Sequence, residues 1–574
     1  MKERLIILGA GVMQGPAIRI AKELGFHTIV LDGSAQAPCI PMADQFEQID
    51  LKDKEGIETF ARSLRGKLRC KRQNSGCPLG IMTAGTDFSA SVAWVAEKLN
   101  LPGIPYEAAL NASDKSRMRS CFKKARLPSP EFTIITAADL YFLSSPQRVR
   151  SPKGELLLSN TAASSCAGTY YINSSTPLDG ALARFPLVIK PVDNMGSRGC
   201  RRIDNINELQ EAAKTALHFS RSGRAIVEAF MDGPEFSVDA IVYNGEITIC
   251  GLADRHIFFP PYFIEMGHTM PTVIEKEKQE AMLETFCEGV RALGLAGEGS
   301  IGAAKGDIKL TANGPMIGEI AARLSGGYMS GWTYPYASGV QPIRAAILAA
   351  MGRKPDGLVP TKTQVCAERA FISIPGTVKT ISCIEQAQNQ PHVKDLFLRI
   401  AEGGKVSFPE NNVTKCGNII AAAGDRAAAI NAAEAAARSI LIRLEPGDNE
   451  TAAFLHPLPT PHSHNSLFPP DAFQLTEELK TALSQIPETQ PPKSSNSGLS
   501  IVPFPAFTTS GLRDYMGRTI EDTMQAVCLL SGFPLTETPE NAENKAILGR
   551  SFWTAFIRGS YQGAVYYIDN LGIK

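Results

Sequence analysis

The stretch GDIKLTANGPMIGEIAARLSGG, residues 306–327, carries the strongest information about the fold. Its two apolar-rich segments are joined by Asn313-Gly314, a strong signal for a β-hairpin. Hairpin pairing would bring Asp307 beside Glu319 on the neighbouring strand. Close carboxylates repel each other, and a divalent cation such as Mg²⁺ relieves that repulsion through hard oxygen ligands. The stretch therefore predicts a metal-binding hairpin, with a solvated acidic edge as the alternative.

The end of the same stretch offers groups for an anion. Arg323 follows Glu319 by four residues and would reach a phosphate held near the carboxylates. Ser325, Gly326 and Gly327 then permit a tight backbone approach to a ligand.

A lysine at the end of an apolar strand lies further upstream. Lys190 closes the segment PLVIK, residues 186–190, and burying an ammonium is costly without an anion nearby. The segment NMGSRG, residues 194–199, follows at once and offers backbone amides, the Ser197 hydroxyl and the Arg198 guanidinium. This combination favours a phosphate-binding loop over a simple hairpin turn. Lys115, in the segment SDKSR at 113–117, is a second candidate for contacting phosphates.

Two acidic residues follow the glycine-rich loop. Glu228 interrupts the apolar strand AIVEAFM, residues 225–231, and Glu235 begins the next apolar stretch. Glu235 would accept hydrogen bonds from both hydroxyls of a ribose.

The first hundred residues alternate strand and helix patterns, which predicts a parallel sheet with helices on both faces. The glycine turn over 9–15, with Asp32 ending the second strand, resembles a dinucleotide fingerprint. Its last glycine comes one position late, so a tight turn that touches a substrate is the favoured interpretation. A nicotinamide-dependent oxidoreductase remains the alternative built on this turn.

The bulk composition excludes several classes. Lys and Arg together number 58, as do Asp and Glu, so no basic excess indicates a nucleic acid or an acidic membrane. No apolar run is long enough for a membrane helix, and the 12 cysteines show no disulfide framework. We expect a cytoplasmic protein, and we interpret His456, His462 and His464 as solvated rather than metal-binding.

The ordered series of lysines, glycine-rich loop, acidic residues and arginine resembles the ATP-grasp superfamily. The amino-terminal part is similar to the pre-ATP-grasp domain of purine-biosynthetic carboxylases and carbamoyl-phosphate synthetase large chains. Residues 319–327 and 265–271 (EMGHTMP) are especially similar to L-amino-acid ligases and related carboxylate–amine ligases. The resemblance covers residues 1 to about 445. It implies an α/β and α+β protein: an ATP-grasp fold with an amino-terminal Rossmann-like domain. Amphipathic stretches beyond residue 500 predict a carboxy-terminal helical extension in addition.

The resemblance, with composition beyond residue 445, indicates domain boundaries. We expect a pre-ATP-grasp domain at 1–112, an ATP-grasp domain at 113–360 with an insertion near 145–180, its lid part at 361–450, a Pro/Ser-rich linker at 451–500 and a helical unit at 501–574. The linker would contain one helix near 476–483, and the helical unit two, near 512–530 and 544–567. An alanine-rich helix is expected over 426–444.

Roles for matching residues follow from the resemblance. ATP would be bound by Lys115, Lys190, Gly196, Ser197, Arg198, Gly199, Glu228, Ala229, Phe230, Met231 and Glu235. Asp307 and Glu319 would hold Mg²⁺, or Mn²⁺, while Arg323 and Lys190 would act in catalysis. Substrate contacts would come from Glu265, His268, Arg323, Gly326 and Gly327.

Two positions depart from the pattern of the family. Many relatives have Asn where this chain has Ala321, which removes a possible ligand to a second Mg²⁺, although the ligase branch that the chain resembles often lacks this Asn too. The first metal carboxylate, often Glu, is the shorter Asp307 here.

The predicted function is an ATP-dependent ligase that activates a carboxylate as an acyl phosphate and couples it to an amine, releasing ADP and phosphate. Alternatives are a bicarbonate-using carboxylase of the purine or carbamoyl-phosphate type, the oxidoreductase named above, and a non-catalytic nucleotide-binding scaffold. The expected partners are small-molecule carboxylates and amines, with a homodimer as the expected assembly.

Overall fold

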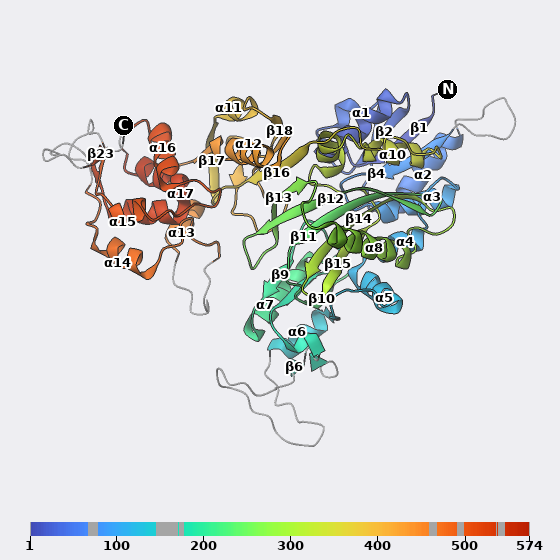
Figure 1. The fold of residues 1–574 in the computed structure, drawn as a ribbon, viewed down its shortest axis with the longest axis horizontal. Helices are drawn as coiled ribbons and strands as arrows, with labels where there is room; N and C mark the ends of the chain where they lie inside the picture. Colours follow the sequence, from blue (N-terminus) through green and yellow to red (C-terminus); the bar gives the residue numbers. More distant parts are fainter. Residues whose placement is uncertain are drawn as a thin grey trace, which may run out of the picture. The chain divides into compact units, whose positions relative to one another are not determined.

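The computed structural model describes residues 2–66, 78–144, 170–171, 177–178, 180–457, 468–490, 499–534, 536–537 and 546–572. Most of the expected insertion near 145–180 lies outside them, as do His462 and His464. The chain forms two compact units, Met1–Phe263 with His268–Cys366, and Ile264–Gly267 with Ala367–Lys574 (Figure 1).

The first unit begins with the expected parallel sheet, in the strand order β3-β2-β1-β4. Its strands are β1 (Arg4–Leu8), β2 (His27–Asp32), β3 (Gln45–Gln48) and β4 (Leu79–Thr83). The helices of this region are α1 (Gly15–Glu23), α2 (Lys54–Gly66) and α3 (Ser89–Leu99), all drawn in blue in Figure 1. Leu5 to Leu8 are fully buried, since a parallel strand covered on both faces has no solvent side. The predicted parallel sheet is confirmed.

The glycine turn after β1 is satisfied within the chain. The Gly11 N–H donates to Gln14 Oε1 at 3.0 Å, and the Ala10 N–H donates to Asp32 Oδ2 at 2.8 Å. Gly9 has φ +99°, and a Cβ built there would lie 3.0 Å from the Gln14 side chain. The turn therefore has a structural explanation that requires no dinucleotide.

A small antiparallel sheet follows, in the order β5-β10-β8-β9. Its members are β5 (Phe132–Thr136), β8 (Leu187–Pro191), β9 (Arg201–Ile203) and β10 (Arg224–Ala229), and α7 (Ile206–Phe219) packs on it. Helices α4 (Tyr106–Ser113), α5 (Lys115–Ala125) and α6 (Ala137–Ser144) belong to the same stretch of chain. Strands β6 (Tyr170–Tyr171) and β7 (Pro177–Leu178) form a separate short pair.

The larger antiparallel sheet of this unit runs in the order β15-β14-β11-β12. Its strands are β11 (Glu235–Tyr243), β12 (Glu246–Phe258), β14 (Ile301–Thr311) and β15 (Gly314–Ala321). The predicted hairpin is confirmed: β14 and β15 are antiparallel, with Asp307 directly opposite Glu319. Ile308, Ile317 and Ile320 are fully buried in one core with Phe286 of α8 (Lys276–Ala292). The alternate residues leave the polar groups on the opposite face.

Three further elements complete this part of the chain. They are β13 (Ile264–Met270), α9 (Tyr334–Ala337) and α10 (Pro342–Ala350). Helix α10 contacts α1 and β4 of the amino-terminal sheet.

The second unit contains strands with helices α11 (Ile384–Gln388) and α12 (Arg426–Ser439). The strands are β16 (Val365–Phe371), β17 (Gly376–Ser382), β18 (Val393–Leu398), β19 (Lys405–Val406), β20 (Gly417–Ala423) and β21 (Leu441–Leu444). The alanine-rich helix expected over 426–444 is wrong in its last residues. It ends at Ser439, because Leu441 to Leu444 pair with β17 as a strand.

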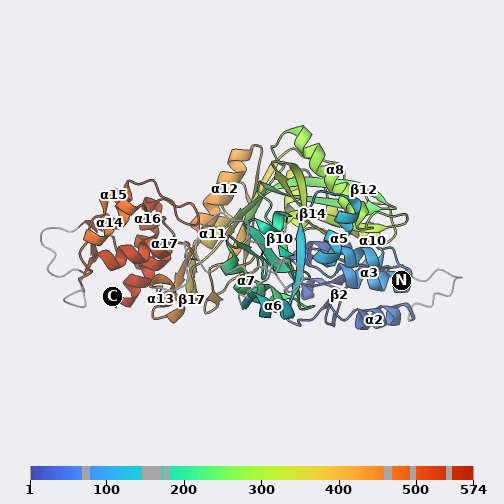
Figure 2. The same cartoon turned by 90° about the horizontal axis from the view of Figure 1, so that it is seen from below.

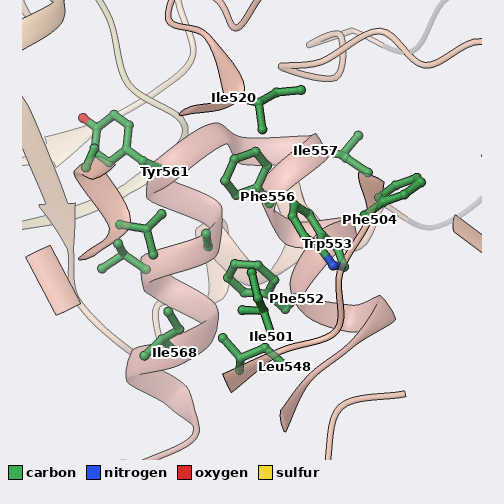
Figure 3. Packing of buried hydrophobic residues seen from close by; sticks show 14 of the residues in the cluster. Ile501, Phe504, Ile520, Leu548, Phe552, Trp553, Phe556, Ile557, Tyr561 and Ile568 are labelled. Atoms are coloured by element: carbon green, nitrogen blue, oxygen red, sulfur yellow. The ribbon is translucent and has the colours of Figure 1, made fainter. Parts of the chain in front are cut away.

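The carboxy-terminal region forms a core of its own. Its helices are α13 (Asn449–Leu455), α14 (Glu477–Gln485), α15 (Pro505–Thr508), α16 (Ile520–Ser531) and α17 (Arg550–Asn570). Trp553 and Phe556 of α17 are fully buried, and Figure 3 shows them among apolar side chains of neighbouring segments. Phe473 and Leu479, in the stretch expected to be a linker, belong to this core as well.

Short strands also take part in the carboxy-terminal region, which was expected to be helical. They are β22 (Leu499–Ile501), β23 (Thr536–Glu537) and β24 (Ala546–Leu548), and they pair in parallel. The view in Figure 2 shows α14, α15, α16 and α17 close together. Among the described residues, none of the helices combines the length and apolar character needed to cross a bilayer.

Candidate active site

The polar face of the larger sheet gathers charged groups from adjacent strands. Asp307 of β14 lies opposite Ser237 of β11 on one side and opposite Glu319 of β15 on the other. Two oppositely charged pairs lie on either side of Asp307 along the same two strands. Glu235 of β11 faces Lys309 of β14, and Asp239 of β11 faces Lys305 of β14. Opposite charges therefore alternate across the strands.

Asp307 is the most heavily contacted carboxylate of this face. Its Oδ1 accepts a hydrogen bond from Ser237 Oγ at 2.7 Å and lies 2.9 Å from Arg255 Nη1. Its Oδ2 contacts Lys305 Nζ. Burial opposes ionisation, yet Arg255 and Lys305 hold the pKa of Asp307 well below its usual range. The group is therefore a carboxylate at neutral pH.

Glu319 is linked to the glycine-rich loop through Lys115. Lys115 Nζ lies 3.3 Å from Glu319 Oε1 and donates to the Asn194 carbonyl at 2.8 Å. Only 6% of Lys115 is exposed, so its ammonium relies on these partners. Burial lowers the pKa of Lys115, but the charges of Glu319 and Asp87 together outweigh burial and the pKa is raised. Two residues 204 positions apart, both predicted from the sequence, thus form an ion pair.

Glu228 is buried between two cations. Its carboxylate lies 2.7 Å from both Arg119 Nε and Lys190 Nζ. Arg119 Nη2 also donates to the Gly318 carbonyl at 2.6 Å. Gly318 is the extra residue of a β-bulge, since Asp307 pairs with Glu319 and Ile308 already pairs with Ile317. Arg119, which sequence reasoning missed, therefore connects the strand of Glu228 to the bulge beside the metal-ligand candidate.

The glycine-rich loop has a backbone that glycine favours. Gly196, Ser197 and Gly199 have positive φ values of 69°, 60° and 68°. A Cβ built on Gly199 would lie 3.0 Å from Phe219, whereas one on Gly196 meets no atom within 4 Å. Gly199 is thus required by packing, and the Gly196 side of the loop is open. The Arg198 guanidinium lies 3.5 Å from the Asn194 side chain at the start of the loop.

A cavity of about 220 Å³ opens beside Glu235 and Phe230. The Phe230 ring lies 4.7 Å from the Arg202 guanidinium carbon and 5.2 Å from Lys309 Nζ. Arg255 pairs with Glu235 in the wall of the cavity and reaches Asp307 as well. Aromatic rings, cations and one carboxylate, Glu235, thus line a space next to Asp307.

Asp87 is a second group that sequence reasoning missed. It follows β4, and Gly85 in the same turn donates its N–H to the Leu324 carbonyl at 3.4 Å. The same carbonyl accepts from Arg323 Nη1 at 3.1 Å. Burial raises the pKa of Asp87, while the charges of Arg323 and Lys115 oppose the rise. The sequence did contain a signal for Asp87: it lies just beyond the carboxyl end of the buried parallel strand β4, where ligands commonly bind in such sheets.

Two glycines predicted as substrate contacts lie at the same junction. A Cβ on Gly326 would lie 3.2 Å from the Gly85 carbonyl oxygen, so the two turns pack closely. Gly327 has φ +61°. Nearby, Ser325 donates its N–H to Asp239 Oδ1 at 3.0 Å, and burial raises the pKa of Asp239 to about 6. The turn after Arg323 is therefore anchored on both sides.

The remaining substrate candidates have other partners. His268 is fully buried in a strand rather than a loop, and its Nε2 lies 3.0 Å from Thr333 Oγ1. Glu265 donates its backbone N–H to Asn412 at 2.8 Å, and its carbonyl accepts from Lys415 at 2.6 Å. Both Glu265 contacts lie within the second unit.

The donor set fits Mg²⁺. Within the described ranges, no group of three or more His, Cys, Asp or Glu is arranged to hold a metal. Mg²⁺ is usually bound by one or two carboxylates together with substrate phosphates and water, so the pair Asp307 and Glu319 suffices. The residues that face each other offer only the hard oxygen atoms that this ion prefers.

Known families match two parts of the chain. The ATP-grasp domain matches residues 183–330, and the L-amino acid ligase C-terminal domain 2 matches residues 370–445. The uncharacterized protein y4rH of Sinorhizobium fredii is 25% identical over 366 residues, which is 63% of this chain and 67% of that protein. Carnosine synthase 1 of Gallus gallus is 22% identical over 366 residues, which is 62% of this chain and only 36% of that protein.

A solved structure shares the fold. The L-amino acid ligase from Bacillus licheniformis superposes with a TM-score of 0.59 at 20% identity, covering 77% of this chain and 99% of that one. The two family matches and the shared fold agree: the chain contains an ATP-grasp domain, followed by a segment that matches a carboxy-terminal domain of L-amino acid ligases.

Proposed function

We propose that the protein is an ATP-dependent ligase that activates a carboxylate as an acyl phosphate and couples it to an amine. The observation that carries this proposal is the Asp307–Glu319 pair, tied through Lys115 to the glycine-rich loop. Phosphoryl transfer from ATP needs carboxylates for a metal, cations for phosphates and backbone amides near them. The names of the relatives, L-amino acid ligase and carnosine synthase, make amino acids the first substrates to test.

The adenosine end of ATP would occupy the cavity beside Phe230. The backbone of residues 228–231 would hold adenine, and Glu235 would accept the ribose hydroxyls. Glu235 contacts Arg255, so ribose binding would exchange that partner for two hydroxyl groups. The Glu228 side chain would take no direct part, because it holds Arg119 and Lys190.

The phosphates would lie between the glycine-rich loop and the carboxylates. Asp307 and Glu319 would hold Mg²⁺, which when bound supplies charge neutralisation at the phosphate oxygens. Lys115, Lys190 and Arg323 would stabilise the charge that develops as the carboxylate attacks the γ-phosphorus. The loop at 196–199 would close over the phosphates and keep water from the acyl phosphate.

The amine would enter beside Asp87. Arg323 would hold the acyl phosphate, and the Asp87 carboxylate would hold the incoming ammonium and take its proton. The amine nitrogen then attacks the carbonyl carbon, the carbon–oxygen bond to phosphate breaks, and phosphate leaves. The closeness of the Asp87 turn to Arg323, through the shared Leu324 carbonyl, supports this assignment.

Phosphate release from Mg-ATP tests the proposal. Purified protein is incubated with pools of L-amino acids and other carboxylates, with and without amines, and bicarbonate serves as a separate arm. Release that requires both a carboxylate and an amine, with an amide product in the mass spectrum, is the expected result. Release with bicarbonate alone, or no release from any pool, would contradict the proposed activity.

A further inference from the structure

Lys305 lies among the carboxylates of the polar face. Lys305 of β14 lies opposite Asp239 of the neighbouring strand β11. Its Nζ contacts Oδ2 of Asp307, which lies two residues further along β14. Its charge also lowers the pKa of Glu319. The side chain is only 14% exposed, so the ammonium is held by these carboxylates rather than by water.

The residue opposite Lys305 on β15 carries no ligand atom. Lys305 pairs in register with Ala321, whose methyl group offers no oxygen to a metal ion. Both carboxylate oxygens of Asp239 already accept hydrogen bonds from Ser325, one from its N–H and one from its hydroxyl. Asp307 and Glu319 are therefore the carboxylates left for a divalent cation at this part of the face.

A second divalent ion and the Lys305 ammonium would compete for the position beside Asp307 Oδ2. A second ion bound near Asp307 Oδ2 would lie within a few ångströms of Lys305 Nζ, where two positive charges repel strongly in a partly buried site. A lysine fixed in the chain can instead supply positive charge without binding from solution.

We propose that Lys305 supplies the charge that a second divalent cation would otherwise bring, so that the complex with ATP holds a single Mg²⁺. The inference rests on the proposed function, because it assumes that ATP binds at this face. Lys305 then acts as a fixed cation beside the metal site, and Ala321 leaves it the room to do so.

The test counts bound Mn²⁺ by electron paramagnetic resonance, with a non-hydrolysable ATP analogue as the nucleotide. Wild-type protein is expected to hold a single Mn²⁺ per bound analogue, and Lys305→Arg should keep that count because the charge remains. The double variant Lys305→Met/Ala321→Asn removes the cation and adds an oxygen ligand. It should hold a pair of Mn²⁺ ions with the spectrum of a coupled pair.

Lys22→Met is the matched control. Lys22 also pairs with an aspartate, Asp44, at 3.1 Å, but it lies on α1 outside the proposed site, so its loss should leave the Mn²⁺ count unchanged. A pair of Mn²⁺ ions in wild-type protein would overturn the inference, as would a folded double variant that still holds a single ion. Failure of the wild type to bind the analogue at all would instead overturn the proposed function.

Discussion

Replacing Glu228 by Gln removes the charge that holds two buried cations together. The carboxylate is only 2% exposed and lies 2.7 Å from both Arg119 and Lys190. Burial opposes its ionisation, yet the two cations lower its pKa from 4.5 to about 2. Because each pKa unit is worth about 1.4 kcal/mol, the ionised group contributes about 3 kcal/mol to stability.

We therefore expect Glu228→Gln to lower the free energy of unfolding by about 3 kcal/mol at neutral pH, at the lower end of the range for breaking a buried ion pair. The pKa of Glu228 is lower in the folded state than in the unfolded state, so this stabilisation weakens as the pH falls. The contribution is complete above about pH 4.5 and is lost as the pH falls toward 2. The difference in unfolding free energy between wild type and variant should therefore shrink as the pH falls.

Hydrogen exchange followed by mass spectrometry measures this effect locally, in peptides from β8 and β10. Urea denaturation gives the global value, with Glu246→Gln as the control because Glu246 is an exposed acid at the start of β12. Equal stability of Glu228→Gln and wild type at pH 7 would refute the reasoning. A gap that does not shrink on acidification would refute the pKa argument.

Three further substitutions test other parts of the site. Arg119→Met leaves the Gly318 carbonyl without its donor and Glu228 with Lys190 as its remaining cation, and should lower the unfolding free energy by about 3–5 kcal/mol in urea; an unchanged midpoint would contradict this. Glu319→Gln should reduce ADP formation by about 10²–10³-fold while the protein remains folded by circular dichroism; full turnover would contradict the metal assignment. Asp87→Asn should lower amide formation by about 10²–10⁴-fold yet still form a hydroxamate when hydroxylamine traps the acyl phosphate. Equal losses in both products would contradict its role toward the amine, and Glu47→Gln, an exposed acid of the same sheet, is its control.

The hairpin could be predicted because its signals are local. Asn313-Gly314 marks the turn, and alternation of apolar and polar residues sets which face each side chain occupies. Once the register is fixed, Asp307 must lie near Glu319. Local patterns also predicted the strand that contains Lys190, which ends one residue later at Pro191, and the parallel sheet at the amino terminus.

Arg119 and Asp87 could not be placed from local pattern, because their partners lie far along the chain. Arg119 contacts Gly318, 199 residues away. One signal was nonetheless present: Lys115 and Arg119 are four residues apart on α5, so they share a helix face, and both are buried. Asp114 fixes the start of this helix by accepting from the Ser116 and Arg117 amides.

The carboxy-terminal strands escaped prediction for a different reason. Strands β22 and β24 have three residues each, too few to show a period of two. The end residues of both strands are buried because the region has a core of its own, to which Phe473 contributes from the stretch that composition marked as a linker. The proline and serine content of residues 451–500 predicted a linker, but the apolar residues in the middle of that segment, such as Phe473 and Leu479, pack into the core.

The charges of the site explain why so many ionisable groups can be buried together. Arg255 contacts both Glu235 and Asp307, and Lys115 contacts Glu319, so the three carboxylates expected to meet ATP and its metal already have cations beside them. A buried carboxylate without a partner would be strongly destabilising. On the proposed function, a ligand at Glu235 or Asp307 would replace an existing ion pair. Because Arg255 contacts both carboxylates, a ribose at Glu235 would change the charge balance at Asp307, and nucleotide binding would then be coupled to metal binding.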